Sequence, residues 1–333
     1  MRRTLTRRAA LRTTLGTMLA AAAACGAPAL AQAPAYPNRP IKIICAFPVG
    51  GIADTFSRLI GQKLGDAWGQ PVVIENRTGA GGNIGADAVA KSPNDGYTIL
   101  MSNIGTHAVN VHLLKALPFD PVKDFVPIAH VLDAEGLLVV HPSVQASSVK
   151  ELVALAKSRP GRLNYSSAGS GTNLHIAAEL FKNLAGVSLT HVPYKGGGPA
   201  LAALLGNEAQ LSFLGIMVVQ AHQDAGRMRA IAVTSPKRSA VMPDVPTIVE
   251  GGVPGYAFSA WYGVLIPAAA PNAIVATWNS AIVKALRSPD MADRIAREGA
   301  DVIASSPVEF GAYLKTELAK WAKVVKDNGL KVE

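Results

Sequence analysis

Three glycine-rich segments each follow an apolar run and precede a helical pattern, and they hold the residues best suited to bind an anion. They are residues 47–54, 166–173 and 194–199. Glycine lets a ligand approach the backbone closely, and the first N–H groups of a helix lack intrahelical partners. Together with the helix dipole, those groups favour a carboxylate or a phosphate. The pattern predicts an anion site, although glycine in such loops can also serve only to form tight turns.

Two side chains near these loops have more than one interpretation. Asp54 is in the first turn of its expected helix, where it either complements the dipole or receives a ligand's ammonium or hydroxyl group. His175 follows Thr172 by three residues and either points toward a ligand or packs within the core. Both interpretations of each residue stay open at this level.

Catalytic and cofactor motifs find little support. Ser170 and His175 are the candidate nucleophile and base of an exported serine hydrolase, but the G-x-S-x-G pattern is absent. Residues 79–85 have the spacing G-x-G-x-x-x-G, which departs from the dinucleotide fingerprint G-x-G-x-x-G. Neither a phosphate-binding P-loop motif nor H-E-x-x-H occurs. We therefore expect a non-enzymatic protein without cofactor or metal.

The elements that position these loops alternate along the chain. Apolar runs at 41–47, 72–74 and 97–101 alternate with helical patterns, and a second series begins after residue 133. This alternation predicts an α/β fold with mostly parallel strands. Residues 126–132 and 137–140 are the expected crossover strands, and residues 241–256 the return linker. An amphipathic helix over 310–325 is expected to dock on the first domain.

A chain that leaves a domain and returns to it forms two lobes joined by two strands around a ligand cleft. We expect lobe 1 to comprise residues 34–132 and 257–333, and lobe 2 to comprise residues 133–256. Residues 251–283 carry no charged side chain. Prolines interrupt this stretch, so it is expected to form a buried strand over 261–266 and a helix from Pro271 rather than a membrane span.

Residues 1–33 have the pattern of an export signal. Basic residues open the chain, a small-residue apolar stretch follows, and Ala31-Gln32-Ala33 fits a cleavage site. Removing the five arginines of this segment lowers the formal net charge from +9 to +4. The mature chain has no Lys/Arg cluster, which argues against nucleic acid as a partner. A hydrophobic content of 49% excludes a disordered chain.

Two features refine the expected periplasmic location. Residues 6–12 resemble a twin-arginine signal, which implies export in a folded state. Cys25 weakly resembles a lipoprotein processing site, but a lipid anchor is the less favoured interpretation. Cys45 lies in an apolar run and is expected to be a buried, unpaired core residue.

Several longer motifs resemble the Bug family, the periplasmic solute-binding proteins of tripartite tricarboxylate transporters. The matching segments are residues 36–41, 48–54, 75–85, 93–98, 117–124, 169–172, 192–199 and 242–247. The resemblance implies a type II periplasmic-binding-protein fold whose lobes close on a small carboxylate. It also implies a monomer that delivers this ligand to membrane subunits of the transporter, or one that presents the ligand to a periplasmic sensor.

The resemblance, added to the loops above, defines the candidate ligand-binding residues. These are Phe47, Gly50, Gly51, Ala53, Asp54, Thr106, His107, Ser167, Gly169, Ser170, Gly171, Thr172, His175, Lys195, Gly196 and Leu214. Leu214 marks a departure, because the family often has an acidic or amide residue near this position. The leucine favours a ligand whose distal group is less polar.

Overall fold

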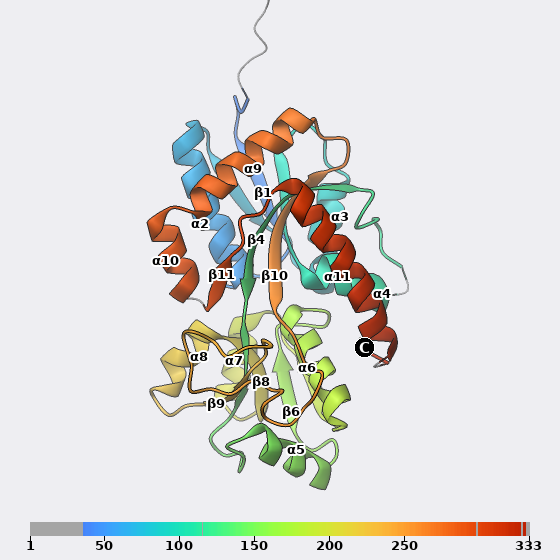
Figure 1. Cartoon of the computed structure of the whole chain (residues 1–333), viewed down its shortest axis with the longest axis vertical. Helices are drawn as coiled ribbons and strands as arrows, with labels where there is room; N and C mark the ends of the chain where they lie inside the picture. Colours follow the sequence, from blue (N-terminus) through green and yellow to red (C-terminus); the bar gives the residue numbers. More distant parts are fainter. Residues whose placement is uncertain (1–35, 115, 298, 328, 331–333) are drawn as a thin grey trace, which may run out of the picture. The chain divides into compact units, whose positions relative to one another are not determined.

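The computed structural model describes residues 36–114, 116–297, 299–327 and 329–330. The expected export signal and Cys25 lie outside these residues. Residues 39–333 form one compact unit, which contains two β-sheets (Figure 1).

The first sheet contains the strands at both ends of the described chain. Its order is β11 (Ala300–Val302), β4 (Phe125–Ala134), β10 (Ala260–Pro267), β3 (Thr98–Asn103), β1 (Ile41–Cys45) and β2 (Val72–Asn76). β1 pairs in parallel with β2 and β3, whereas β10 runs antiparallel to β3 and β4. β1 is almost wholly buried, as its continuous apolar run predicts for a central strand.

The second sheet is built from the middle of the chain. Its order is β7 (Thr190–Pro193), β6 (Asn164–Ser167), β8 (Leu211–Gly215), β5 (Gly136–Val140) and β9 (Arg229–Val233). β6 pairs in parallel with β7 and β8, and β5 runs antiparallel to β8 and β9. Both sheets are therefore mixed, although β1 to β4 share one direction in the first sheet and β6 to β9 share one direction in the second. The reason is that the strand entering each sheet from the other, β10 or β5, runs against the parallel core, whereas the leaving strands β4 and β9 run along it.

Two links join the sheets, one of a single residue and a longer return link over residues 234–259. Glu135 alone separates β4 from β5, and its amide donates to the Gly299 carbonyl at 3.2 Å. The return link passes beside the first, since Phe258 N donates to the Thr234 carbonyl at 3.0 Å and Thr234 N donates to the Gly136 carbonyl at 2.8 Å. The expected crossover strands 126–132 and 137–140 correspond to β4 and β5, and β4 runs side by side with the returning strand β10 (Figure 1).

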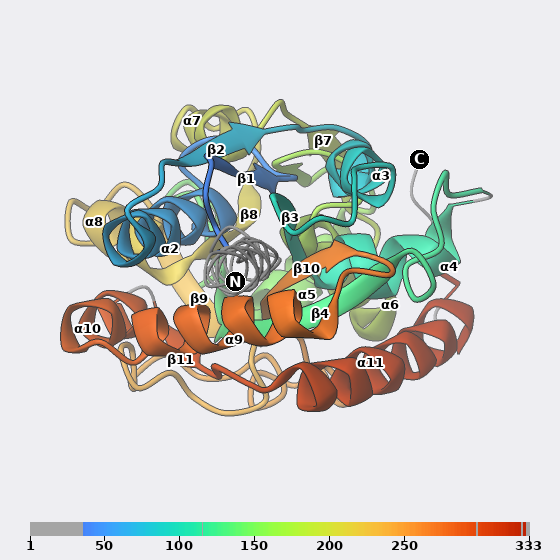
Figure 2. The ribbon, with the colours of Figure 1, turned by 90° about the horizontal axis from the view of Figure 1, so that it is seen from above.

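The helices pack on both sheets. The first sheet carries α2 (Ile52–Trp68), α3 (Asn83–Ala90), α4 (Asn110–Leu113), α9 (Asn272–Leu286), α10 (Pro289–Arg297) and α11 (Pro307–Asp327), with a 3₁₀ turn η1 (Ala80–Gly82) and a π-helical turn η2 (Gly105–Val109). The second carries α5 (Val149–Ser158), α6 (Asn173–Ala185), α7 (Gly197–Leu205) and α8 (Ile216–Gln223). Figure 2 shows α9 and α11 along the β4 side of the first sheet.

The C-terminal helix docks on the first sheet, as the sequence predicts. α11 packs against β4 and η2, and it buries Phe310, Leu314 and Trp321. The Phe310 ring lies directly over Gly263 of β10, where a Cβ would come within 2.2 Å of the ring. A glycine is therefore required in the middle of this strand for close helix–sheet packing.

Two further expectations are confirmed. The uncharged stretch 251–283 forms β10 and α9, and none of the helices within the described residues is long and apolar enough to cross a bilayer. Cys45 is unpaired and fully buried, and burial raises the pKa of its thiol to about 11.

Candidate functional site

The first candidate loop joins β1 to α2 and is organised around the buried carboxylate of Asp54. Its Oδ2 accepts hydrogen bonds from the Gly50 amide at 3.0 Å and from Arg58 Nε at 3.1 Å. Its Oδ1 accepts from Arg58 Nη2 and Asn76 Nδ2, each at 2.8 Å. Asn76 Nδ2 also donates to the Phe47 carbonyl at 2.9 Å. Because both oxygens already have protein donors, this geometry favours a loop-holding role for Asp54.

The second loop joins β6 to α6 and is also tied down by its own polar groups. The Gly169 amide donates to Ser167 Oγ at 3.1 Å, and the Gly171 amide donates to His175 Nδ1 at 3.0 Å. The Thr172 amide and hydroxyl both donate to the Gly169 carbonyl. Ser170 differs, because neither its amide nor its hydroxyl has a partner among the described residues. Ser170 is half-buried and is thus the member of this loop whose donors are unused.

A third segment, around η1, was not among the candidate residues. Gly79, Ala80, Gly81 and Gly82 have consecutive positive φ values of 123, 47, 66 and 98°. Such backbone is rare for a non-glycine residue like Ala80 and concentrates at functional sites. The Gly81 carbonyl accepts from Thr106 Oγ1 at 3.0 Å, which ties η1 to η2. The glycine-rich run is evident in the sequence, but its positive φ values and its contact with η2 follow from tertiary structure.

Loops from the two sheets meet at these segments. A Cβ on Gly81 would lie 2.9 Å from the Gly171 carbonyl oxygen, and a Cβ on Gly105 would lie 3.0 Å from the same oxygen. A Cβ on Gly196 would lie 3.3 Å from Pro48 Cβ. The candidate residues Gly171, Gly196 and the β1–α2 loop therefore belong to one contact region between the sheets.

Unpaired buried amide groups gather in the same region. Asn110 Oδ1 and Asn173 Oδ1 lack hydrogen-bond partners within the described part of the chain, and the side chains are 1% and 6% exposed. Asn173 Nδ2 donates to the Tyr262 hydroxyl at 3.2 Å, across the two sheets. Asn83, which follows η1, is 3% exposed and has no partner for either side-chain atom. An unpaired buried polar atom costs about 1–3 kcal/mol, so these atoms indicate a site for a polar ligand.

The helices that begin in this region lack side-chain caps. α2, α6, α7 and α8 start after Gly51, Thr172, Gly196 and Gly215, and no side chain caps their first N–H groups. By contrast, α5 starts with a Ser148 hydroxyl that accepts from the Glu151 amide at 3.2 Å. Uncapped N–H groups of two helices, one from each sheet, are suited to an anion that lies between them.

Two candidate residues lie elsewhere. His107 is buried among Phe119, Phe125 and side chains of α11, on the other side of η2 from Gly81. Leu214 is packed in a hydrophobic cluster of the second sheet with Leu137 and Ile216. The preference of this position for a less polar distal group of the ligand stays a prediction.

The remaining candidates divide by exposure. Phe47, Ala53, Thr106, Ser167 and His175 are buried, whereas Gly50, Gly51 and Lys195 are exposed. A Cβ on Gly82 would lie 3.0 Å from the Phe47 ring and 2.4 Å from Thr106 Oγ1, which places both residues beside η1.

His175 is held as a neutral packing residue beside the second loop. Its ring stacks on His191 with a centroid distance of 4.1 Å, and its Nδ1 accepts from the Gly171 amide. Burial, followed by the nearby His191 and Lys182, lowers its pKa to about 3. Its Nε2 lies 3.9 Å from Glu179 Oε1. The Nδ1 lone pair is therefore already used and cannot take a proton from Ser170.

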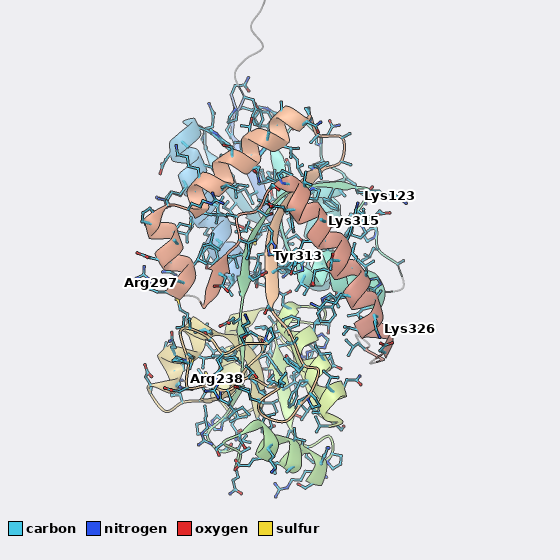
Figure 3. The ribbon with its side chains drawn as sticks, in the orientation of Figure 1. Lys123, Arg238, Arg297, Tyr313, Lys315 and Lys326 are labelled. Carbon is cyan, nitrogen blue, oxygen red and sulfur yellow. The ribbon has the colours of Figure 1, made fainter. Side chains whose placement is uncertain are left out.

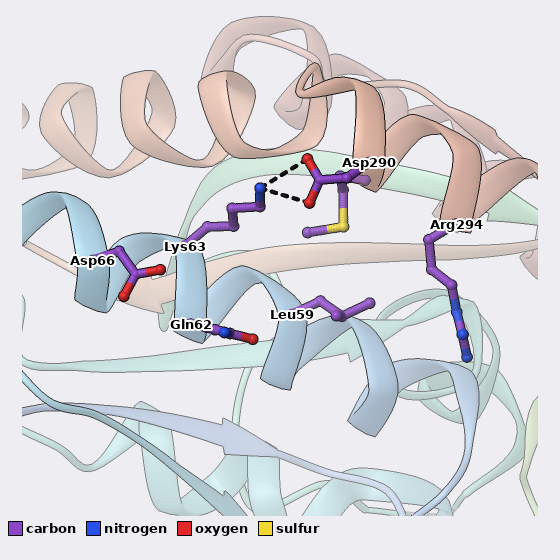
Figure 4. A pocket seen from close by; sticks show the side chains of 7 residues that line it. Leu59, Gln62, Lys63, Asp66, Asp290 and Arg294 are labelled. Atoms are coloured by element: carbon purple, nitrogen blue, oxygen red, sulfur yellow. Dashed lines mark hydrogen bonds and ion pairs between the residues drawn. The ribbon is translucent and has the colours of Figure 1, made fainter.

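A small hollow of about 150 Å³ lies apart from this region, between α2 and α10 (Figure 4). Lys63 and Asp290 line this hollow from opposite helices, and Lys63 Nζ lies 2.8 and 2.6 Å from the two carboxylate oxygens of Asp290. This ion pair fastens α10 to α2 and accounts for the polar character of the hollow.

Comparison with solved structures identifies the class of protein to which this fold belongs. The chain has 35% sequence identity to Rpa4515 of R. palustris with adipate, with a TM-score of 0.84 over 89% of this chain and 99% of that one. It has 33% identity to MatC of Rhodopseudomonas palustris with bound malate, with a TM-score of 0.82 over 87% of this chain and 100% of that one. The periplasmic binding protein BugD gives a TM-score of 0.83 at 30% identity, covering 89% of this chain and 99% of that one. These likenesses confirm the two-lobed α/β fold of periplasmic solute-binding proteins.

The family follows from the sequence. Residues 56–330 match the tripartite tricarboxylate transporter family receptor. BugT of Bordetella pertussis strain Tohama I is 36% identical over 312 residues, which are 93% of this chain and 96% of BugT. The chain therefore belongs to the tripartite tricarboxylate transporter receptor family, and the Bug resemblance is confirmed. This family consists of substrate-binding receptors rather than enzymes, so the serine hydrolase hypothesis is wrong.

Proposed function

We propose that the chain is a periplasmic receptor that binds a small dicarboxylate between its two lobes and delivers it to the membrane subunits of a tripartite tricarboxylate transporter. The observation that carries this proposal is that the loops preceding two uncapped helices, α2 and α6, belong to one contact region that also holds unpaired Asn side chains. Relatives at 33% and 35% identity bind malate and adipate, which are both dicarboxylates.

Backbone amides supply most of the recognition in this proposal. The Gly51 and Ala53 amides at the start of α2 and the Ser170 amide before α6 bind the carboxylate, because the Gly169, Gly171 and Thr172 amides already have partners. Asp54 and His175 hold these loops in place rather than contact the ligand. Helix N-termini favour an anion by up to about 2 kcal/mol each in partly buried geometry.

The two lobes, residues 34–132 with 257–333 and residues 133–256, close on the ligand by bending at the two links. A ligand that contacts both lobes stabilises the closed state, which the membrane subunits recognise. The receptor acts as a monomer in the periplasm, after export and cleavage behind Ala33.

A thermal-shift panel tests the binding step. The mature chain is mixed with adipate or malate, and separately with adipamide, which has the length of adipate but no charge. A ligand that binds only the folded state raises Tm by mass action. We expect a clear rise with a dicarboxylate and none with adipamide. An equal rise with adipamide would contradict an anion site.

An uptake assay tests delivery. Cells with the membrane subunits are compared with and without this chain, using the labelled dicarboxylate that gave the largest shift. We expect uptake only when the chain is present. Binding without any gain in uptake would instead favour presentation of the ligand to a periplasmic sensor.

A further inference from the structure

A cavity of about 430 Å³ lies beneath α11, away from the region where the two sheets meet. Its walls come from β4, β10, η2 and α11, all of which belong to or pack on the first sheet. The lining is largely apolar and includes Phe125, Leu265, Leu314 and Leu318. The volume falls within the range of small-molecule sites, which is about 300–1,000 Å³.

One buried polar group faces this cavity. His107 lines it, is 1% exposed, and has no partner for Nε2 anywhere in the described residues. Its Nδ1 lies 2.6 Å from Ser102 Oγ. When the Ser102 hydroxyl donates to Nδ1, the ring proton resides on Nε2, which then needs an acceptor. Burial lowers the pKa of His107 to about 3, so the ring is neutral at pH 7.

Part of the cavity wall is exposed, and one of its walls begins at a capping box. Val122 and Val308 line the cavity and are 50% and 82% exposed, and Lys315 of α11 lines it as well (Figure 3). The start of α11 is fixed by a capping box, in which the Glu309 amide donates to Ser306 Oγ at 3.2 Å and the Ser306 amide donates to Glu309 Oε2 at 2.8 Å. The capping box therefore fixes the start of the helix that forms one wall of the cavity.

We propose that this cavity is a second binding site, which takes a small aromatic molecule whose neutral oxygen accepts a hydrogen bond from His107 Nε2. An aromatic body fits beside Phe125, whose ring meets His107 edge-on at 4.8 Å. A carboxylate at the buried end would be desolvated among apolar walls without a cation, so a carbonyl or hydroxyl oxygen is preferred.

The second site is separate from the dicarboxylate site, although both use η2. Thr106 donates to the Gly81 carbonyl on one side of this turn, whereas His107 faces α11 on the other. The two sites therefore differ in the chemistry of their ligands, one anionic and one neutral.

Photolabelling with benzophenone tests this proposal, because the probe has a neutral carbonyl between two rings and inserts into nearby C–H bonds under light. The mature chain is irradiated with the probe, and labelled peptides are mapped by mass spectrometry. We expect labels on α11 and β10, and about tenfold weaker competition by diphenylmethane, which lacks the carbonyl. Adipate should not compete. Equal competition by diphenylmethane, or protection by adipate, would overturn the proposal.

Matched variants on α11 locate the site. Ala312 lines the cavity from an exposed position, so Ala312→Trp should fill it and abolish the labelling. Ala319 is exposed on the same helix outside the lining, so Ala319→Trp should label like the unmodified chain. His107→Phe keeps a ring but removes the donor and should reduce labelling about tenfold. Equal labelling of the two tryptophan variants would overturn the assignment.

Discussion

Gly171 lies where loops of the two sheets come close together, since Cβ atoms on Gly81 and Gly105 would lie 2.9 and 3.0 Å from its carbonyl oxygen. Its φ of +77° is left-handed, and a Cβ there would lie 3.0 Å from Asn110 Oδ1. An L-residue pays about 1–2 kcal/mol for this conformation, so Gly171→Ala should weaken dicarboxylate binding roughly tenfold by isothermal titration calorimetry.

Gly51→Ala is the matched control for Gly171→Ala. Gly51 has an ordinary φ of −83°, and a Cβ there would meet only the Pro48 carbonyl oxygen at 3.6 Å. Its amide remains in place, so affinity should change less than about threefold. Lys195→Ala should also have a smaller effect than Gly171→Ala. The reverse ranking would mean that Lys195, rather than the backbone, holds the carboxylate.

The hydrogen bonds of the Asp54 carboxylate should make the free energy of unfolding fall at acid pH. Burial alone raises its pKa, but donors from Arg58, Gly50 and Asn76 outweigh burial and hold the pKa below the ordinary value of 3.8. The stabilisation is therefore present above about pH 4 and is lost as pH falls through the lowered pKa. Asp54→Asn should cost about 1–3 kcal/mol in urea unfolding at pH 7, and the difference should shrink toward pH 3. A difference that stays constant with pH would contradict this role, and exposed Asp224→Asn is the control.

The sequence predicted which residue types lie in the contact region, but not which way each side chain points. The sequence predicted Thr106, Ser170 and Gly171. Thr106 and Gly171 lie where loops of both sheets meet, and Ser170 has unused hydrogen-bond donors. It could not predict that His107 faces α11, because neighbouring residues of one helical turn point to different sides and only tertiary packing decides which. Asn173 was missed for the same reason, since its partner Tyr262 is distant in sequence.

At the scale of elements, α11 depends on a glycine in the strand beneath it. Gly263→Ala would place a Cβ 2.2 Å from the Phe310 ring, so we expect a loss of about 1–3 kcal/mol in the free energy of unfolding. Gly311→Ala is the matched control on α11, where a Cβ would meet only Pro127 Cγ at 3.7 Å. Alanine in mid-helix should stabilise by about 0.5–1 kcal/mol. Chemical denaturation that shows equal effects would contradict the packing described for Phe310.

Periodicity predicted elements more reliably than their pairing. The apolar face of α11 and the buried strand β10 were evident, since each repeats its pattern over many residues. The three-residue β11 and the π-helical η2 were not, because neither is long enough to show a period. The reversed directions of β5 and β10 follow from where the chain crosses between sheets, which periodicity does not encode.

At the scale of the whole molecule, we expect the two lobes to move closer together, by bending at the two links, when the ligand binds. Spin labels at Ala67→Cys on α2 and Ala221→Cys on α8 report this movement, since both positions are exposed. Cys45 should remain unlabelled because it is fully buried and its thiol pKa is raised to about 11. Electron–electron double resonance should show a shorter and narrower distance distribution with the bound dicarboxylate. An unchanged distribution would contradict closure around the ligand.

The central claim is that backbone amides at two helix starts bind the carboxylate. Assigned ¹H–¹⁵N NMR spectra of the mature chain test it directly, by titration with the dicarboxylate from the thermal-shift panel. The account predicts large downfield shifts for the Gly51, Ala53 and Ser170 amide protons and a smaller shift for the Gly171 amide, which already donates to His175. Adipamide should leave all of them in place. Unshifted amides in a saturated complex, or shifts confined to the region of Lys195, would contradict the account.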